Sequence, residues 1–195
     1  MLDHKEKMKK QFVLIVSLGV LAVPLAAQTD AAANPLSAWL RTAYKNNLNS
    51  ILRSAEKMPE EFYDLRPGPQ QEVRTFGQQV GHLANYNFLW CSQAKLEKNP
   101  NGANLEKLAT KAEFIKALND AVAYCEGAYN ALTDASGAET IDITTEGGQS
   151  RKNLRMGLLI LNYAHNNEIY GSMVSYMRMK SIVPPASEPR PQQKK

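Results

Sequence analysis

Histidine and cysteine are both scarce in this chain, which has three His and two Cys among 195 residues. No Ser-His-Asp order, glycine-rich phosphate loop or pair of closely spaced carboxylates rises above chance, so the common motif-defined enzyme classes find no support. Lys and Arg are not concentrated on one face together with stacking aromatic residues, which argues against a nucleic-acid partner. The sequence also shows no repeat of solenoid length. Its length fits one domain with a core of its own.

Residues 1–27 have the composition of a secretory signal peptide. Four lysines precede the apolar run at residues 12–23, and small residues follow it up to Ala27. The run is shorter than a membrane-spanning helix needs, and an uncleaved amino-terminal anchor is the alternative. No cysteine lies at the expected cleavage site at the end of this segment, which argues against a lipid anchor. We therefore expect an exported protein, periplasmic or secreted, without membrane attachment once the signal peptide is cleaved.

The region from residue 34 to residue 183 predicts an all-α domain. Apolar residues recur there at spacings of three and four, which is typical of amphipathic helices. Four helices without a strand pattern indicate a four-helix bundle, with at most a short extended piece at residues 141–143. The proline-rich, polar residues 184–195 predict a disordered tail. The four helical blocks cover residues 34–58, about 75–96, 110–132 and about 150–179.

Two of these blocks begin with recognisable start signals. Asn34 is a capping residue and precedes Pro35, which suits the first helical position. Thr110 is followed three residues later by Glu113, which is the capping-box pattern. In the last block, the steps of four and three predict an inward stripe. That stripe comprises Leu154, Leu158, Leu161, His165, Glu168 and Ser172.

Only two histidines remain outside residues 1–27, namely His82 in the second block and His165 in the fourth. Both fall on or beside the inward stripes of their helices, so their imidazoles could share a metal site in the bundle core. The alternative is that each is a core histidine whose nitrogens are hydrogen-bonded. A pocket between these helices, with Tyr86 and Ile169 also lining it, could admit a small molecule.

Three stretches of the chain carry a resemblance to a known family. They are Met58-Pro-Glu-Glu-Phe-Tyr-Asp-Leu-Arg-Pro67, Val80-Gly-His-Leu-Ala-Asn-Tyr-Asn-Phe-Leu-Trp-Cys91 and Asn162-Tyr-Ala-His-Asn-Asn-Glu-Ile-Tyr-Gly171. Together they resemble the DinB-like family of metal-dependent four-helix-bundle proteins. The resemblance spans about residues 36–187, and its most specific part is the end of the last helix with the closing Ile182-Val-Pro-Pro185. It implies a four-helix bundle that pairs as a homodimer in many family members.

This resemblance also implies a metal site, from which the chain departs at one position. Family members place one His on the second helix and a His-x-x-x-His pair on the fourth around a divalent metal. His82 and His165 match the first two ligands, but Ile169 occupies the third position and cannot ligate. Glu168 shares a helix face with His165 and is a weak third candidate, although a solvated surface residue is its simpler interpretation. Two histidines with a carboxylate or water could hold Zn²⁺, Ni²⁺ or Fe²⁺ only weakly.

The two cysteines, Cys91 and Cys125, form an even pair in a chain that we expect to be exported. The oxidising compartment favours a disulfide between them, and two buried free thiols are the alternative. A catalytic thiol is less favoured, because neither cysteine lies in a Cys-x-x-Cys pair or beside a basic residue that would lower its pKa.

Two functional classes follow from the sequence. The first is an exported DinB-like domain with a degenerate metal site, which binds a small molecule or acts as a structural domain. The alternative is a metal-dependent transferase, isomerase or hydrolase that uses a low-molecular-weight thiol and holds its metal with His82 and His165.

Overall fold

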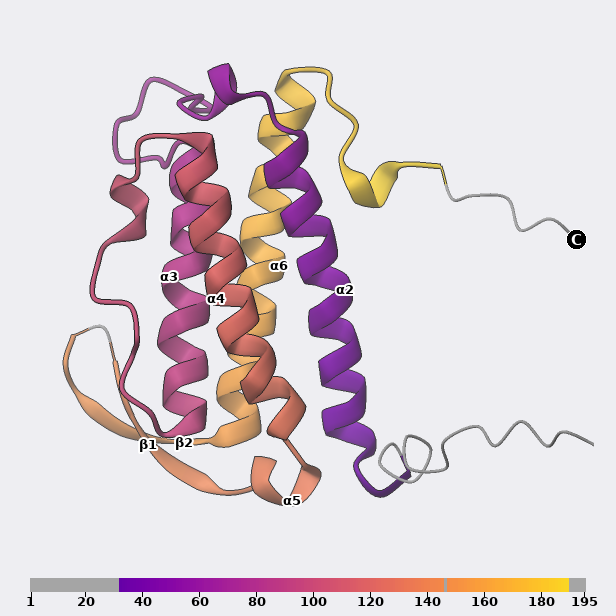
Figure 1. Ribbon diagram of the computed structural model, residues 1–195, viewed down its shortest axis with the longest axis vertical. Helices are drawn as coiled ribbons and strands as arrows, with labels where there is room; N and C mark the ends of the chain where they lie inside the picture. Colours follow the sequence, from indigo (N-terminus) through magenta and orange to yellow (C-terminus); the bar gives the residue numbers. More distant parts are fainter. Residues whose placement is uncertain (1–31, 146, 190–195) are drawn as a thin grey trace, which may run out of the picture.

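The computed structural model describes residues 32–145 and 147–189, so the predicted signal peptide and residues 190–195 of the predicted tail lie outside the described residues. Four long helices form a bundle, which confirms the predicted all-α fold (Figure 1). These helices are α2 (Pro35–Lys57), α3 (Phe76–Lys95), α4 (Lys111–Ala131) and α6 (Arg155–Met179). No helix in the described ranges combines the length and apolar character of a membrane span.

The helices follow an up-down-down-up order, which determines where the site lies. Helices α3 and α4 run parallel, since Gly77 of α3 lies against Phe114 and Cys91 of α3 is bonded to Cys125. A 20-residue helix is about 30 Å long, so at least about nine extended residues must return the chain to the start of α4. Residues 96–110 make this crossover along the side of α3 (Figure 1). Helix α2 packs against α4 and α6, so it lies diagonally opposite α3.

Short elements complete the chain. Strands β1 (Thr140–Thr144) and β2 (Ser150–Leu154) form an antiparallel hairpin in which Ile143 faces Arg151. The expected extended piece at residues 141–143 is thus part of a strand. The fourth block was predicted to be helical from residue 150, but its first five residues pair with β1 instead. The remaining short elements are η1 (Glu60–Phe62), η2 (Leu105–Lys107), α5 (Asp134–Gly137) and η3 (Pro185–Ser187).

Of the two start signals predicted from the sequence, the one at α4 forms as expected and the side-chain cap at α2 does not. Thr110 and Glu113 form the predicted capping box of α4, and Thr75 forms another with Gln78 at the start of α3. At α2, however, the carboxylate of Asp134 accepts the first free N–H groups, those of Leu36 and Ser37, at 3.1 and 2.8 Å. Asn34, which was expected to cap this helix, instead accepts the Asp134 backbone N–H. Such a long-range cap carries no local sequence pattern.

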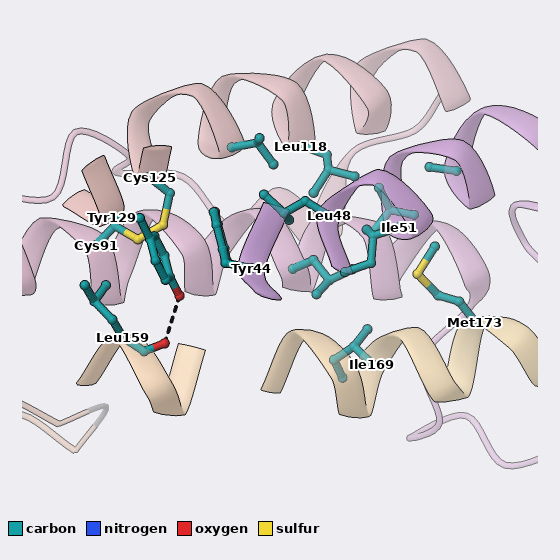
Figure 2. Packing of buried hydrophobic residues seen from close by; sticks show 14 of the residues in the cluster. Tyr44, Leu48, Ile51, Cys91, Leu118, Cys125, Tyr129, Leu159, Ile169 and Met173 are labelled. Carbon is teal, nitrogen blue, oxygen red and sulfur yellow. Dashed lines mark hydrogen bonds between the residues drawn. A yellow bond between two sulfur atoms is a disulfide. The ribbon is translucent and has the colours of Figure 1, made fainter. Parts of the chain in front are cut away.

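A disulfide joins Cys91 of α3 to Cys125 of α4, with 5.2 Å between their Cα atoms. Both cysteines are completely buried in the core. Beside them the rings of Tyr44 and Tyr129 stack at a centroid distance of 3.7 Å, and the Tyr129 hydroxyl donates to the Leu159 carbonyl (Figure 2). The predicted disulfide is therefore present, and it fixes the two parallel helices to each other.

A group of buried amides crosses the middle of the bundle. Asn87 of α3 donates to Asn166 of α6 at 3.0 Å and accepts a hydrogen bond from the Tyr44 hydroxyl at 3.0 Å. Asn162 of α6 donates to the same Asn87 oxygen at 3.3 Å. Because an amide buried without partners is costly, this network favours one register of α3 against α6.

The buried face of α6 differs from the predicted stripe. Leu158 is buried as expected, but Leu154, Leu161 and Glu168 are exposed. Helix α6 packs against both α2 and α3, and Asn162 with its neighbours on that face points into the core. A search for apolar spacing counts only apolar residues and misses these buried asparagines. The predicted stripe is therefore rotated around the helix toward the solvent-exposed side.

The predicted tail packs against the bundle over its first six residues. Pro184 and Pro185 are buried, and Glu188 forms ion pairs with Arg53 and Lys57 of α2. The expectation of an unpacked segment from residue 184 therefore differs from the structure up to residue 189.

Candidate functional site

His82 of α3 and His165 of α6 are in contact, as their positions on the facing helices predict. Their Nε2 atoms are 3.0 Å apart, and their ring centroids are 5.0 Å apart. The difference between these distances shows that the rings meet nearly end-on through their Nε2 atoms. His82 is 5% exposed, while the ring of His165 is half-buried. The two imidazoles thus share one hydrogen bond across the α3–α6 interface.

Glu106 from the crossover determines which nitrogen of His82 carries the proton. Its Oε1 lies 2.7 Å from His82 Nδ1, and its Oε2 accepts a hydrogen bond from Arg74 Nε at 2.8 Å. An ionised carboxylate can only accept, so Nδ1 of His82 carries the hydrogen and its Nε2 presents a lone pair. His165 must then donate its Nε2–H to His82.

The protonation states of His82 and Glu106 are consistent with this assignment. Burial lowers the pKa of His82, and the nearby Arg74 and His165 lower it further, against the opposing effect of Glu106. Burial alone would raise the pKa of Glu106. The hydrogen bonds from Arg74 and His82 outweigh it, however, and hold that pKa below its usual value. Near neutral pH the site therefore contains a neutral His82 beside a carboxylate–guanidinium pair.

The crossover lies close to α3 because two residues of that helix allow it. A Cβ atom at Gly81 would collide with the Leu105 carbonyl, so only glycine permits this approach. One turn later, Asn85 accepts the Leu105 N–H at 3.1 Å and donates to Asn104 at 3.2 Å. These contacts place the next residue, Glu106, beside His82.

Between α3 and the crossover lies an open cleft of about 420 Å³. His82, Arg74 and Glu106 line it together with Tyr86, and the asparagines of the crossover form the opposite wall. A volume of this size suits a small molecule. Its polar lining and its balanced pair of opposite charges suit a polar ligand better than an apolar one.

An aromatic wall continues from the histidine pair along α3. The Tyr86 ring lies 4.5 Å from the His82 ring and 4.8 Å from the His165 ring, measured between centroids. Trp90, one turn further, lies 4.8 Å from Tyr86 and 5.2 Å from His165. The half-buried side of His165 is thus covered by two aromatic rings of α3.

Two other sequence-predicted residues lie apart from the shared hydrogen bond. Glu168 is 75% exposed at its side chain, and its Oε2 lies 3.4 Å from His165 Nδ1, the ring nitrogen that does not contact His82. Ile169 is 6% exposed and belongs to the apolar core cluster rather than to the lining of the cleft.

Comparison with known proteins agrees with this architecture. Residues 43–166 match the family model described as the DinB superfamily, which is more than half of the chain. The chain belongs to the DinB superfamily. No curated protein matches it significantly.

Two solved DinB-like proteins share the fold. A DinB-like protein from Bacillus cereus ATCC 10987 superposes with a TM-score of 0.61 at 15% identity, covering 75% of this chain and 93% of its own. A DinB-like protein from Bacillus subtilis, YjoA, gives a TM-score of 0.59 at 18% identity, covering 80% and 99% respectively. At these identities the likeness concerns the fold alone.

The metal centre that the DinB resemblance implies does not fit the residues of this member. Among the described residues, no group of three His, Cys, Asp or Glu side chains is placed to hold a metal ion. His82 and His165 meet, but Ile169 occupies the third ligand position of the family, and the lone pair of one histidine already accepts a hydrogen from the other. Zinc sites generally need at least three protein ligands.

Sequence reasoning did not identify Glu106, which is the principal partner of His82. It lies 24 residues after that histidine in an irregular segment, so no helical spacing connects the two. Gly81, which precedes His82, offered the only local signal, because a mid-helix glycine often marks a close approach of another backbone.

Proposed function

We propose that this protein is an exported member of the DinB superfamily that binds a small polar molecule beside His82 and has lost the three-histidine metal centre. The observation that supports this proposal is the hydrogen bond between the Nε2 atoms of His82 and His165, with Ile169 at the third ligand position. Because each of these Nε2 atoms is the hydrogen-bond partner of the other, the two histidines form a structural pair that a ligand can contact.

The cleft supplies the recognition groups in this proposal. His82 is fixed in one tautomer by Glu106, and Arg74 offers the donors that Glu106 does not use. The asparagine-rich crossover wall is held by its own hydrogen bonds, so the cleft has its shape before a ligand arrives. Export is supported by the composition of residues 1–27 and by the disulfide, since disulfides persist in oxidising compartments.

A second candidate is a metal-dependent enzyme of the thiol-transferase type, and one observation favours it. In metal sites a carboxylate commonly accepts the Nδ1–H of a ligating histidine, as Glu106 does for His82. Metal content distinguishes the two candidates. A pure binding protein would contain no stoichiometric metal, whereas the enzyme would.

The test measures metal in the purified, signal-cleaved protein and in two variants, His82→Ala and Ile169→His. We expect substoichiometric metal in the wild-type protein after incubation with Zn²⁺ or Ni²⁺. Ile169→His places a second imidazole on the His165 face of α6, so it should gain metal and a metal-dependent rise in melting temperature. Stoichiometric metal in the wild type that disappears in His82→Ala would refute the proposal and support the enzyme.

A further inference from the structure

A second hollow of about 200 Å³ lies where α3, the hairpin and α6 meet, and no function described above uses it. Most of its wall is apolar, and it is open to solvent on one side. It adjoins the polar cleft, because Tyr86 and Leu89 line both. The side chains that line it are Tyr86, Leu89, Trp90, Gln93, Ile143, Thr144, Thr145, Arg151, Asn153, Leu158 and Leu161.

The hairpin register brings one cation to this apolar hollow. Arg151 lies directly opposite Ile143 in the ladder, and paired residues of an antiparallel hairpin point to the same face. Ile143 is buried against the helices, so Arg151 also emerges on the helix-facing side, where both residues line the hollow. A cation on this face is unusual, because alternation normally places charged residues on the solvent face.

The neighbouring cation shows the ordinary arrangement. Lys152 projects from the outer face of the hairpin, where it forms an ion pair with Asp142 opposite it at 3.0 Å. Arg151, by contrast, forms no ion pair with any carboxylate of the described residues. Its guanidinium is therefore available to an anion from outside the chain, next to the apolar wall of Trp90 and Leu158.

We infer that this hollow binds an amphiphilic carboxylate, whose apolar body lies against Trp90 and Leu158 and whose carboxylate pairs with Arg151. This inference rests on the proposed function and names the class of ligand that would occupy the polar cleft and the adjoining hollow. Guanidinium and carboxylate pair through two parallel hydrogen bonds, which fixes orientation as well as charge. An aromatic wall offers a large contact area to an aliphatic or aromatic body.

The joined arrangement also specifies the orientation of the ligand. Its carboxylate end is held at the hairpin, and any polar substituent on the other end reaches past Tyr86 toward His82 and Arg74. A ligand with a cation in place of the carboxylate would meet the Arg151 charge and be rejected.

The experiment compares three probes with the same phenyl group and a four-carbon chain: 4-phenylbutanoate, 4-phenylbutanol and 4-phenylbutylamine. Binding is followed by calorimetry and by the amide NMR signals of α3 and the hairpin, in the full signal-cleaved protein. We expect the carboxylate to bind at least about tenfold more tightly than the alcohol, and the amine to bind most weakly. Arg151→Gln should reduce carboxylate binding to the alcohol level, while the matched control Lys152→Gln should leave it unchanged.

Equal binding of the three probes, or carboxylate binding that Arg151→Gln does not weaken, would overturn the assigned ligand class. The absence of any shift on α3 or the hairpin would overturn the hollow as a binding site. Both outcomes are independent of the metal content of the protein, which alone decides between the proposed function and the enzyme. Because Arg151 is exposed on a short hairpin, its substitution should not prevent folding.

Discussion

The disulfide between Cys91 and Cys125 should stabilise the domain mainly by restricting the unfolded chain. The bonded residues are separated by 34 positions. Closing a loop of this length lowers the entropy of the unfolded state enough to contribute about 4 kcal/mol at 25 °C. For a domain of this size, that corresponds to a melting temperature higher by about 8–16 °C.

The measurement compares urea unfolding of the oxidised protein with that of the same protein after reduction in the unfolded state. Reduction changes no side-chain volume, so it isolates the cross-link. The double variant Cys91→Ala with Cys125→Ala should be destabilised further than the reduced wild type. It also removes both sulfur atoms, which lie within 3.4 Å of Asn162 Nδ2, and leaves space in a closely packed core.

Burial adds a kinetic expectation. Both cysteines are 0% exposed, so a reductant should reach the bond only when the domain opens, and the reduction rate should follow the unfolding rate. Free energies of unfolding for the oxidised and reduced protein that differ by less than about 1 kcal/mol would refute the chain-entropy reasoning. Fast reduction of the folded protein would show that α3 and α4 separate locally.

Three further results are expected. Gly81→Ala should lower the free energy of unfolding by about 1–3 kcal/mol, because its Cβ meets the Leu105 carbonyl; unchanged urea unfolding would contradict this. The folded-state pKa values of His82 and Glu106 are both lowered, so the unfolded chain binds more protons in acid, and stability should fall as the pH drops below about 6.5. His82→Gln should flatten the upper part of that profile, and an identical profile would refute the assignment. Asp134→Ala should speed amide exchange in the first turn of α2, whereas unaltered exchange would show that the cap is dispensable.

The bundle could be predicted from the sequence because its signals are local. Apolar spacing predicted the four long helices, and the Thr110 capping box predicted the start of α4. The strand at residues 150–154 was assigned to a helix, since a five-residue polar segment has little periodicity of its own and is defined by its partner strand. The cap of α2 by Asp134 was missed for the same reason, as its partner is about one hundred residues away.

The histidine pair was predictable, but its surroundings were not. Helical spacing placed His82 and His165 on inward faces, and the structure joins them. The position of Glu106 depends on the parallel order of α3 and α4, which forces the chain to return along α3. Periodicity gives the faces of helices but not their directions, so the crossover and its cleft could not be derived from it.

The way in which α3 is held has a consequence for selectivity. A capping box fixes its start, the crossover rests on it at Gly81, and the disulfide ties Cys91 near its end to α4. Residues such as Tyr86 therefore project from a preorganised platform, and a ligand that settles on it loses little affinity to the ordering of that wall. No side chain of β2 is buried, so discrimination among related ligands should arise mainly from changes in the side chains of this strand. Substitutions along β2 should therefore change ligand specificity without disturbing the arrangement of α3.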